Sequence, residues 1–471
     1  MWKIDIKAPF GGFLRKYYLD DYINVGANNQ ANDMKCISLN KSSYITPGYT
    51  PAKTEETSEV IYKFSNLDSQ GNSYGISNTK VFQVGSSVTD SANYPHTISG
   101  AAAAGFWNNI VVYKDNLYYF WHTFSGGDIG KATSITATPS FDDDWGSTED
   151  DNLEEGDYTP VYVTLDNILI FGNGQYLGWY DGTTLDTKFY DFGSNLRIKA
   201  ITEQGGYIYI AVNNKNSDLG YIYIINNNID SDVSIIDMIN VGDQIDELYT
   251  VNGIIYVFHR ETMGEDASKI GYISGNRIIE LDIFYEGTPS QIEFVSDIMF
   301  FTSEESVLGL STPYNSNQFL LTRPLDVVSG TSLGGGGLKS TGSRLLHSYS
   351  GASKFYVEFY NLTSKGIDAY WTSKTWITST IDELSMIDSI FVKTNALEED
   401  AKCNLEIYTN RSGTASKTLE ISGENKTRHI FRNLGISGIE EFKIKLDFSV
   451  GKIGDVVEIQ EIQIGGHTYQ L

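Results

Sequence analysis

Paired strands recur along the middle of the chain, between about Gly105 and Tyr360. Each pair consists of two short runs in which apolar and polar residues alternate, joined by a turn, as expected of an antiparallel hairpin with a buried face. The first residues of the clear pairs are Ile110, Ile168, Tyr207, Ile254 and Ile298. After a longer first step, successive pairs begin roughly 39 to 47 residues apart, which is the spacing of β-propeller blades.

The repeat predicts an all-β chain built on a β-propeller of six or seven blades. Six units are distinct, and a seventh requires either an early unit before Gly100 or closure of the propeller by an N-terminal strand. In an early unit, strands over 59–64 and 79–84 would be joined by a loop over Ser69–Ser77. The four glycines from Gly334 to Gly337 are expected to form a flexible turn or linker, because glycine has no side chain to pack.

The strand pattern changes from about Asp368. Beyond this point, longer strands alternate apolar with charged residues, which is typical of a half-buried antiparallel sheet. The sequence therefore predicts three parts: a lead segment over 1–55, a β-propeller over 56–365 and a small antiparallel β-sandwich over 366–471. The lead segment is expected to supply docking strands, or a strand that closes the propeller.

The composition excludes several classes of protein. The formal net charge of −26 argues against nucleic acid as the main partner, because binding to phosphates needs clustered Lys and Arg. No stretch of 18 uncharged apolar residues is present, so no membrane span is predicted. Residues Met1–Lys7 alternate like a strand and lack the apolar core of an export signal. The two cysteines, Cys36 and Cys403, are too few for a disulfide scaffold.

An acidic loop over Phe141–Asp157 explains the longer first step between strand pairs. It is the candidate interaction loop of the chain, and a solvated, mobile excursion is the alternative. Its candidate residues are Phe141, Asp142, Asp143, Asp144, Trp145, Asp150 and Asp151. The carboxylates could bind calcium, but their spacing does not match the calcium-binding loop D-x-[DN]-x-[DN]-G-x5-E.

No catalytic, cofactor-binding or metal-binding residue can be named from a motif. None of the six histidines lies within five residues of another, so no H-E-x-x-H pair exists. The segment Trp371–Trp376 matches only the end of the S-x-D-x-G-x-T-W repeat of sialidases. Carboxylates from several blades can still meet at a propeller axis, and a glycoside hydrolase would place two or three there, about 5 Å apart in a retaining enzyme.

Three stretches resemble tailed-phage virion proteins that combine a short lead segment, a β-propeller and a C-terminal β-sandwich. The first contains Trp2-Lys3-Ile4, the Gly11-Gly12 pair and a Thr46-Pro47-Gly48 turn, the second is the blade series, and the third is the closing strand pattern from Ser389 to Ile464. The resemblance implies a non-enzymatic structural component of the tail, the neck or the capsid surface, without a cofactor.

The resemblance also implies partners and location. The partners would be other virion proteins, with the chain as a cyclic homo-oligomer in the particle, assembled in the host cytoplasm. A propeller that binds a host-surface glycan or receptor is the main alternative function, followed by a glycoside hydrolase and by a bacterial scaffold propeller.

Overall fold

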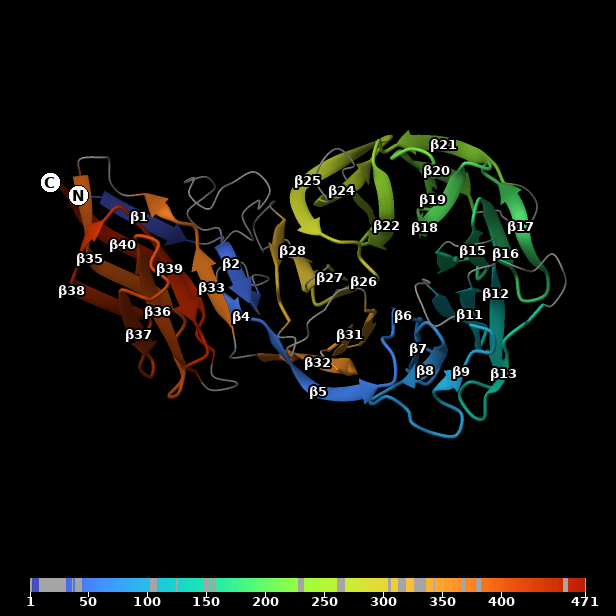
Figure 1. Ribbon diagram of the computed structural model, residues 1–471, viewed down its shortest axis with the longest axis horizontal. Coiled ribbons are helices and arrows are strands. Elements are labelled where there is room, and N and C mark those ends of the chain that lie inside the picture. The colour runs from blue at the N-terminus through green and yellow to red at the C-terminus, as the bar shows by residue number, and fades with distance from the viewer. Residues whose placement is uncertain are drawn as a thin grey trace.

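The computed structural model is all-β, which confirms the predicted class. Most of its four-stranded antiparallel sheets lie in a propeller-like ring, and a second group of sheets lies beside the ring (Figure 1). Within the described part of the chain, no helix is long and apolar enough to cross a membrane. The structure describes residues 2–7, 31–35, 37–38, 45–101, 108–123, 126–146, 153–154, 158–227, 233–260, 267–303, 306–311, 319–325, 336–342, 344–351, 353–365, 369–377, 383–451 and 456–470.

Seven of the sheets in the described residues form the ring. Six contain four consecutive strands each, and the seventh contains β30, β31, β32 and β5. The six sheets are β6–β9 (Lys63–Phe64, Ser73–Ile76, Lys80–Val84, His96–Thr97), β10–β13 (Asn109–Tyr113, Asn116–Thr123, Gly126–Thr133, Ser140–Asp142), β14–β17 (Val161–Val163, Leu169–Asn173, Tyr176–Tyr180, Leu185–Asp191), β18–β21 (Leu196–Gln204, Tyr207–Asn214, Gly220–Asn226, Ile235–Asn240), β22–β25 (Gln244–Val251, Ile254–Arg260, Ala267–Ser274, Arg277–Glu286) and β26–β29 (Ile292–Val295, Ile298–Thr302, Val307–Ser311, Leu320–Thr322).

The hairpin between the first two strands of a ring sheet is often a two-residue turn. In the β22–β23 turn, Asn252 and Gly253 have φ values of 51° and 75°. Positive φ at both central residues matches the right-handed twist of the flanking strands, and Asn-Gly adopts this conformation readily. The turn therefore fixes which residues of the two strands pair, and the alternation of side chains then buries the apolar face between neighbouring sheets.

The seventh ring sheet joins distant parts of the chain. It consists of β30 (Leu338–Thr341), β31 (Arg344–Ser350), β32 (Phe355–Lys365) and the N-terminal strand β5 (Tyr49–Thr57). β5 pairs antiparallel with β32 as its outer strand. The end of the ring is thus hydrogen-bonded to the segment that precedes its first sheet.

Two local expectations differ from the structure. The predicted loop over Ser69–Ser77 contains a strand, β7, in which every side chain is buried. Gly336 and Gly337 do not behave as a linker: the Gly337 N–H donates to Ile61 O at 2.8 Å, and a Cβ on Gly336 would lie 1.6 Å from Ser348 O. These glycines are required because backbone packs against backbone there. Gly334 and Gly335 lie outside the described residues.

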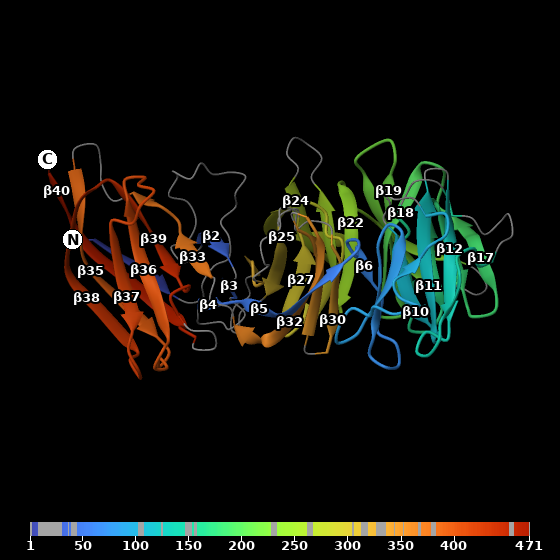
Figure 2. The same cartoon turned by 60° about the horizontal axis from the view of Figure 1, so that its bottom comes forward.

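The C-terminal strands form two further sheets beside the ring (Figure 2). One has the order β1-β40-β35-β38, and the other has the order β2-β33-β39-β36-β37, with β34 also paired to β39. A separate two-stranded sheet contains β3 and β4. The bounds are β1 Trp2–Lys7, β2 Ala31–Lys35, β3 Ile37–Ser38, β4 Thr46–Pro47, β33 Tyr370–Ser373, β34 Trp376–Ile377, β35 Glu383–Thr394, β36 Lys402–Thr409, β37 Lys417–Ser422, β38 Arg428–Ile439, β39 Glu441–Asp447 and β40 Ile459–Gln470.

Two strands of the lead segment, β1 and β2, belong to these sheets. β1 pairs antiparallel with β40, and β2 pairs antiparallel with β33. Both sheets contribute to one hydrophobic core, in which Ile6 of β1 packs with residues such as Ile390 and Leu405. Within the described residues, strands β1, β2 and β5 each pair on one side and lie at the edge of their sheets, β1 and β2 in the C-terminal sheets and β5 in the ring.

Candidate functional site

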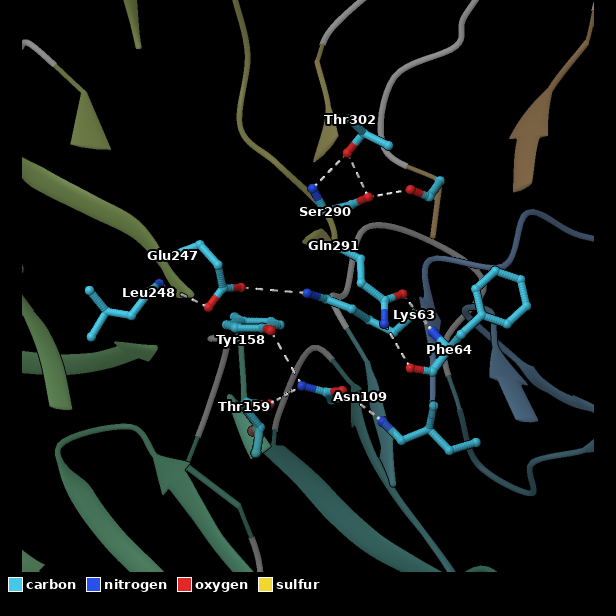
Figure 3. Close-up of polar contacts among 12 residues, drawn as sticks. Lys63, Phe64, Asn109, Tyr158, Thr159, Glu247, Leu248, Ser290, Gln291 and Thr302 are labelled. Atoms are coloured by element: carbon cyan, nitrogen blue, oxygen red, sulfur yellow. Dashed lines mark hydrogen bonds and ion pairs between the residues drawn. The ribbon is translucent and has the colours of Figure 1, made fainter. Parts of the chain in front are cut away.

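A cavity of about 440 Å³ lined by polar and apolar residues lies at the centre of the ring. The first strand of each ring sheet contributes to its wall, from Lys63 of β6 to Lys339 of β30. Polar and charged side chains from sheets far apart in the sequence point toward one another there (Figure 3). We call this cavity the axial channel.

An ion pair reaches across the axial channel. Lys63 Nζ lies 3.8 Å from Glu247 Oε2, and these residues come from the first and fifth ring sheets (Figure 3). Lys63 Nζ also lies 4.9 Å from the ring centroid of Tyr158, within cation–π range. Burial lowers the pKa of Lys63 and raises the pKa of Glu247, and the charge of each partner opposes the shift of the other.

A second ion pair lies between the sixth and seventh ring sheets. Lys339 Nζ lies 2.7 Å from Glu293 Oε1. Burial raises the pKa of Glu293, and the charge and hydrogen bond of Lys339 oppose this shift. Each of the two channel carboxylates thus has an ammonium partner, which supplies the compensation that a buried charge requires.

Side-chain amides bind the backbone of other sheets around the channel. Gln291 Nε2 donates to Phe64 O at 2.8 Å, and Gln291 Oε1 accepts from Phe64 N at 2.9 Å (Figure 3). Asn66 forms the same two-bond contact with Val112, with both distances 2.8 Å. An amide imitates a strand partner in this geometry, because it donates and accepts at once. These contacts join the first ring sheet to the sixth and the second.

Another charged cluster lies within the fifth ring sheet. His259 is buried, its Nδ1 lies 3.0 Å from Asp243 Oδ2, and its Nε2 lies 3.1 Å from Glu280 Oε1. Burial alone would lower the pKa of His259, but the hydrogen bonds to Asp243 and Glu280 outweigh burial and raise the pKa to about 9. The imidazolium therefore donates from both nitrogens at neutral pH and links β23 to β25 and to the segment before β22.

Asp143 of the predicted acidic loop is held by several donors. Its carboxylate accepts from His96 at 2.8 Å, from the Tyr119 hydroxyl at 2.5 Å and from the Ser99 N–H at 2.9 Å. Burial would raise the pKa of Asp143, but these hydrogen bonds outweigh burial and lower the pKa. Asp143 thus ties the end of the second ring sheet to the first.

The aromatic residues of the loop are packed against ring sheets. Trp145 makes edge-on contacts with Tyr118 and Tyr180 at centroid distances of 5.2 and 5.1 Å. Phe141 stacks on His96 at 3.8 Å. These contacts correct the alternative of a solvated excursion for this part of the loop.

The remaining loop candidates divide into two groups. Asp142 and Asp144 are exposed. Asp150 and Asp151 lie outside the described residues. The structure therefore leaves two acidic side chains of the described loop free to face solvent, while it brings Phe141, Asp143 and Trp145 into contact with the ring.

The channel residues were not found from the sequence, because no local motif marks them. Lys63 and Glu247 are far apart along the chain and meet only when the ring closes. The available signal was the presence of charged residues within a first strand, as in Asp246 and Glu247 of the Ile245–Leu248 stretch. Among the residues that the structure describes, no group of three or more His, Cys, Asp or Glu side chains is arranged to hold a metal ion.

Comparison with known proteins gives only distant similarities. No protein-family model matches the chain, and no curated protein matches it. The exo-beta-1,3-galactanase of Phanerochaete chrysosporium, solved with galactose, has 10% identity and a TM-score of 0.34, covering 78% of this chain and 97% of its own. The AfRom2 CNH domain has 8% identity and a TM-score of 0.41, covering 65% and 98%.

A designed protein shows the same level of likeness. The computationally designed Ika8 protein has 9% identity and a TM-score of 0.39, covering 66% of this chain and 99% of its own. Similarities of this size carry no argument about the activity, ligands or partners of the chain.

Proposed function

We propose that the chain is a non-enzymatic structural component of a bacteriophage virion, at the tail, the neck or the capsid surface, where it acts as a rigid docking module. In this proposal, the ring is a seven-bladed β-propeller over residues 56–365 that is completed by strand β5 of the lead segment, and the C-terminal sheets form a β-sandwich over 366–471. The lead segment over 1–55 joins these two domains. Copies of the chain bind neighbouring virion proteins and form a cyclic homo-oligomer.

The observation that carries the docking role is the way in which the lead segment ties both domains together. β1 and β2 pair within the C-terminal sheets, and β5 completes the seventh ring sheet. Because these three strands belong to one short stretch of chain, the connection between the two domains is anchored by strand pairing at both of its ends. A rigid body with many surface loops suits a role in assembly.

The axial channel supports the same role. Its two lysines and two glutamates neutralise each other in pairs, and its amides bind backbone groups of other sheets. These polar groups thus hold the sheets of the ring to one another. The virion context rests on the resemblance of the lead segment, the repeat and the C-terminal strand pattern to phage structural proteins.

The proposal is tested by quantifying the chain in particles produced by the genome that encodes it. Particles are purified on a density gradient, and the chain is measured by mass spectrometry relative to the major capsid protein. The proposal expects a fixed copy number that follows the particle peak. Recovery of the chain only in the soluble fraction would overturn the proposal.

A glycoside hydrolase is the second candidate, and one observation favours it. Burial raises the pKa of both channel glutamates, Glu247 and Glu293, and a carboxyl group with a raised pKa can act as a general acid. Hydrolysis of a panel of aryl glycosides that is lost in both Glu247→Gln and Glu293→Gln would support this candidate. Absence of turnover in the wild-type chain would remove it.

A further inference from the structure

Strand β38 is the outermost strand of its sheet, at the end of the molecule away from the ring (Figures 1 and 2). It pairs with β35 on one side only within the described residues. Between Arg428 and Arg432 the register with β35 runs without a shift, from Lys393↔Arg428 to Ser389↔Arg432. This part of β38 is therefore a regular edge, the kind of edge to which another strand can add.

The hydrogen-bond pattern shows which groups face outward. The Thr394 N–H donates to Thr427 O, so this pair is of the hydrogen-bonded type. Because hydrogen-bonded and non-hydrogen-bonded pairs alternate in an antiparallel ladder, His429 and Phe431 bond β35. The N–H and C=O groups of the intervening residues then point away from the sheet. These residues are Arg428, Ile430 and Arg432.

The same three residues also carry exposed side chains. Arg428 and Arg432 are exposed, and Ile430 is 57% exposed. The alternate residues face the core, where His429 is buried and Phe431 packs against the C-terminal hydrophobic cluster. An incoming strand would thus meet a backbone edge and a cation–apolar–cation row of side chains on the same residues.

The edge formed by β38 is positively charged, whereas the chain as a whole is negatively charged. The chain as a whole carries −26, whereas the edge presents two arginines, with exposed Lys426 and Lys393 beside them. The ion pairs of the described residues include neither Arg428 nor Arg432. A second copy of β38, paired antiparallel about Ile430, would set each arginine against an arginine, and like charges directly opposite each other destabilise a pair.

We propose that β38 is a strand-addition site for a partner protein that presents an extended acidic segment. The segment has a carboxylate residue, an apolar residue and a second carboxylate residue at alternate positions, opposite Arg428, Ile430 and Arg432. Backbone hydrogen bonds hold the added strand, and the two charge pairs select it. This inference rests on the proposed docking role and specifies the chemistry of one partner.

The test uses the full chain and two labelled peptides, TETITET and its charge-reversed counterpart TKTITKT, with binding followed by fluorescence anisotropy. We expect the acidic peptide to bind and the basic peptide to bind at least about tenfold more weakly, with an affinity that falls as salt rises. The double variant Arg428→Glu/Arg432→Glu should reverse the preference. Lys417→Glu, a charge reversal at an exposed residue of the edge strand β37, is the matched control and should leave the preference for the acidic peptide unchanged.

Amide hydrogen exchange distinguishes strand addition from non-specific charge attraction, because only strand addition protects alternate backbone amides of β38. The acidic peptide should slow exchange at the outward amides of Arg428, Ile430 and Arg432 and leave His429 and Phe431 unchanged. Equal binding of the two peptides, or a preference that survives the double reversal, would overturn the proposal. Absence of TETITET binding at millimolar concentration would also overturn the strand-addition proposal. The docking role is tested separately, by the measurement of the chain in purified particles.

Discussion

Removal of one partner of the Lys63–Glu247 pair should destabilise the ring more than removal of both. At 3.8 Å, two unit charges attract each other by roughly 4 kcal/mol at an effective dielectric constant of about 20. Lys63→Met removes this attraction and leaves Glu247 as a buried, uncompensated carboxylate. We expect the single variant to lose about 3 kcal/mol of unfolding free energy, and Glu247→Leu to lose a similar amount.

The double variant Lys63→Met/Glu247→Leu should recover most of this loss, because two apolar side chains need no compensation. Hydrogen–deuterium exchange of peptides from β6 and β22 measures the effect in the ring, and peptides from β36 serve as a reference in the same molecule. Lys354→Met, which breaks the exposed pair of Lys354 with Glu56, is the control and should change neither region. Additive losses in the double variant would refute the argument that the two charges stabilise each other.

Three further predictions test other contacts. Because the folded-state pKa of His259 is raised from 6.5 to about 9, its contribution to stability is complete below pH 6.5 and is lost as the pH rises through 9. In urea titrations, the free energy of unfolding of the wild-type chain should therefore fall by on the order of 2 kcal/mol over this pH range, and this fall should be absent in His259→Gln. Gly336→Ala should lower the free energy of unfolding by about 3 kcal/mol or more, because the added Cβ would overlap the Ser348 carbonyl oxygen. Gly413→Ala, with nothing within 4 Å of the added Cβ, is the control and should leave the thermal melting temperature nearly unchanged. Trp145→Ala should lower the free energy of unfolding by about 2 kcal/mol, because the packing of the indole ring is lost. Asp144→Asn, a change at an exposed side chain of the same loop, should leave the free energy of unfolding nearly unchanged. Equal effects of the two substitutions would show that this loop is not packed.

The ring repeat could be predicted because its signal is local. The strand pairs that begin near Ile168, Tyr207 and Ile254 correspond to strands of the structure, since alternation and turn residues act over only a few positions. The strand Ser73–Ile76 was missed. Its residues, Ser-Tyr-Gly-Ile, combine short polar and glycine residues that favour turns in isolation, and they form a strand only because neighbours on both sides bury them.

The channel and the packed glycines could not be predicted, for a different reason. The pairing of Lys63 with Glu247 depends on closure of the whole ring, and no spacing rule relates residues so far apart. Gly336 looked like part of a linker, because a glycine run permits flexibility and close backbone contact equally well. The acidic loop was predicted from its charge, whereas its position is fixed by Trp145 and by the donors around Asp143.

Cryo-electron microscopy of the particle that contains this chain tests the central claim most directly. The account predicts repeated, symmetry-related copies, each with the ring and the C-terminal sheets held as one rigid body and in contact with neighbouring virion proteins. Particles of full composition that lack density for this chain would contradict the claim, as would a freely diffusing monomer absent from every particle.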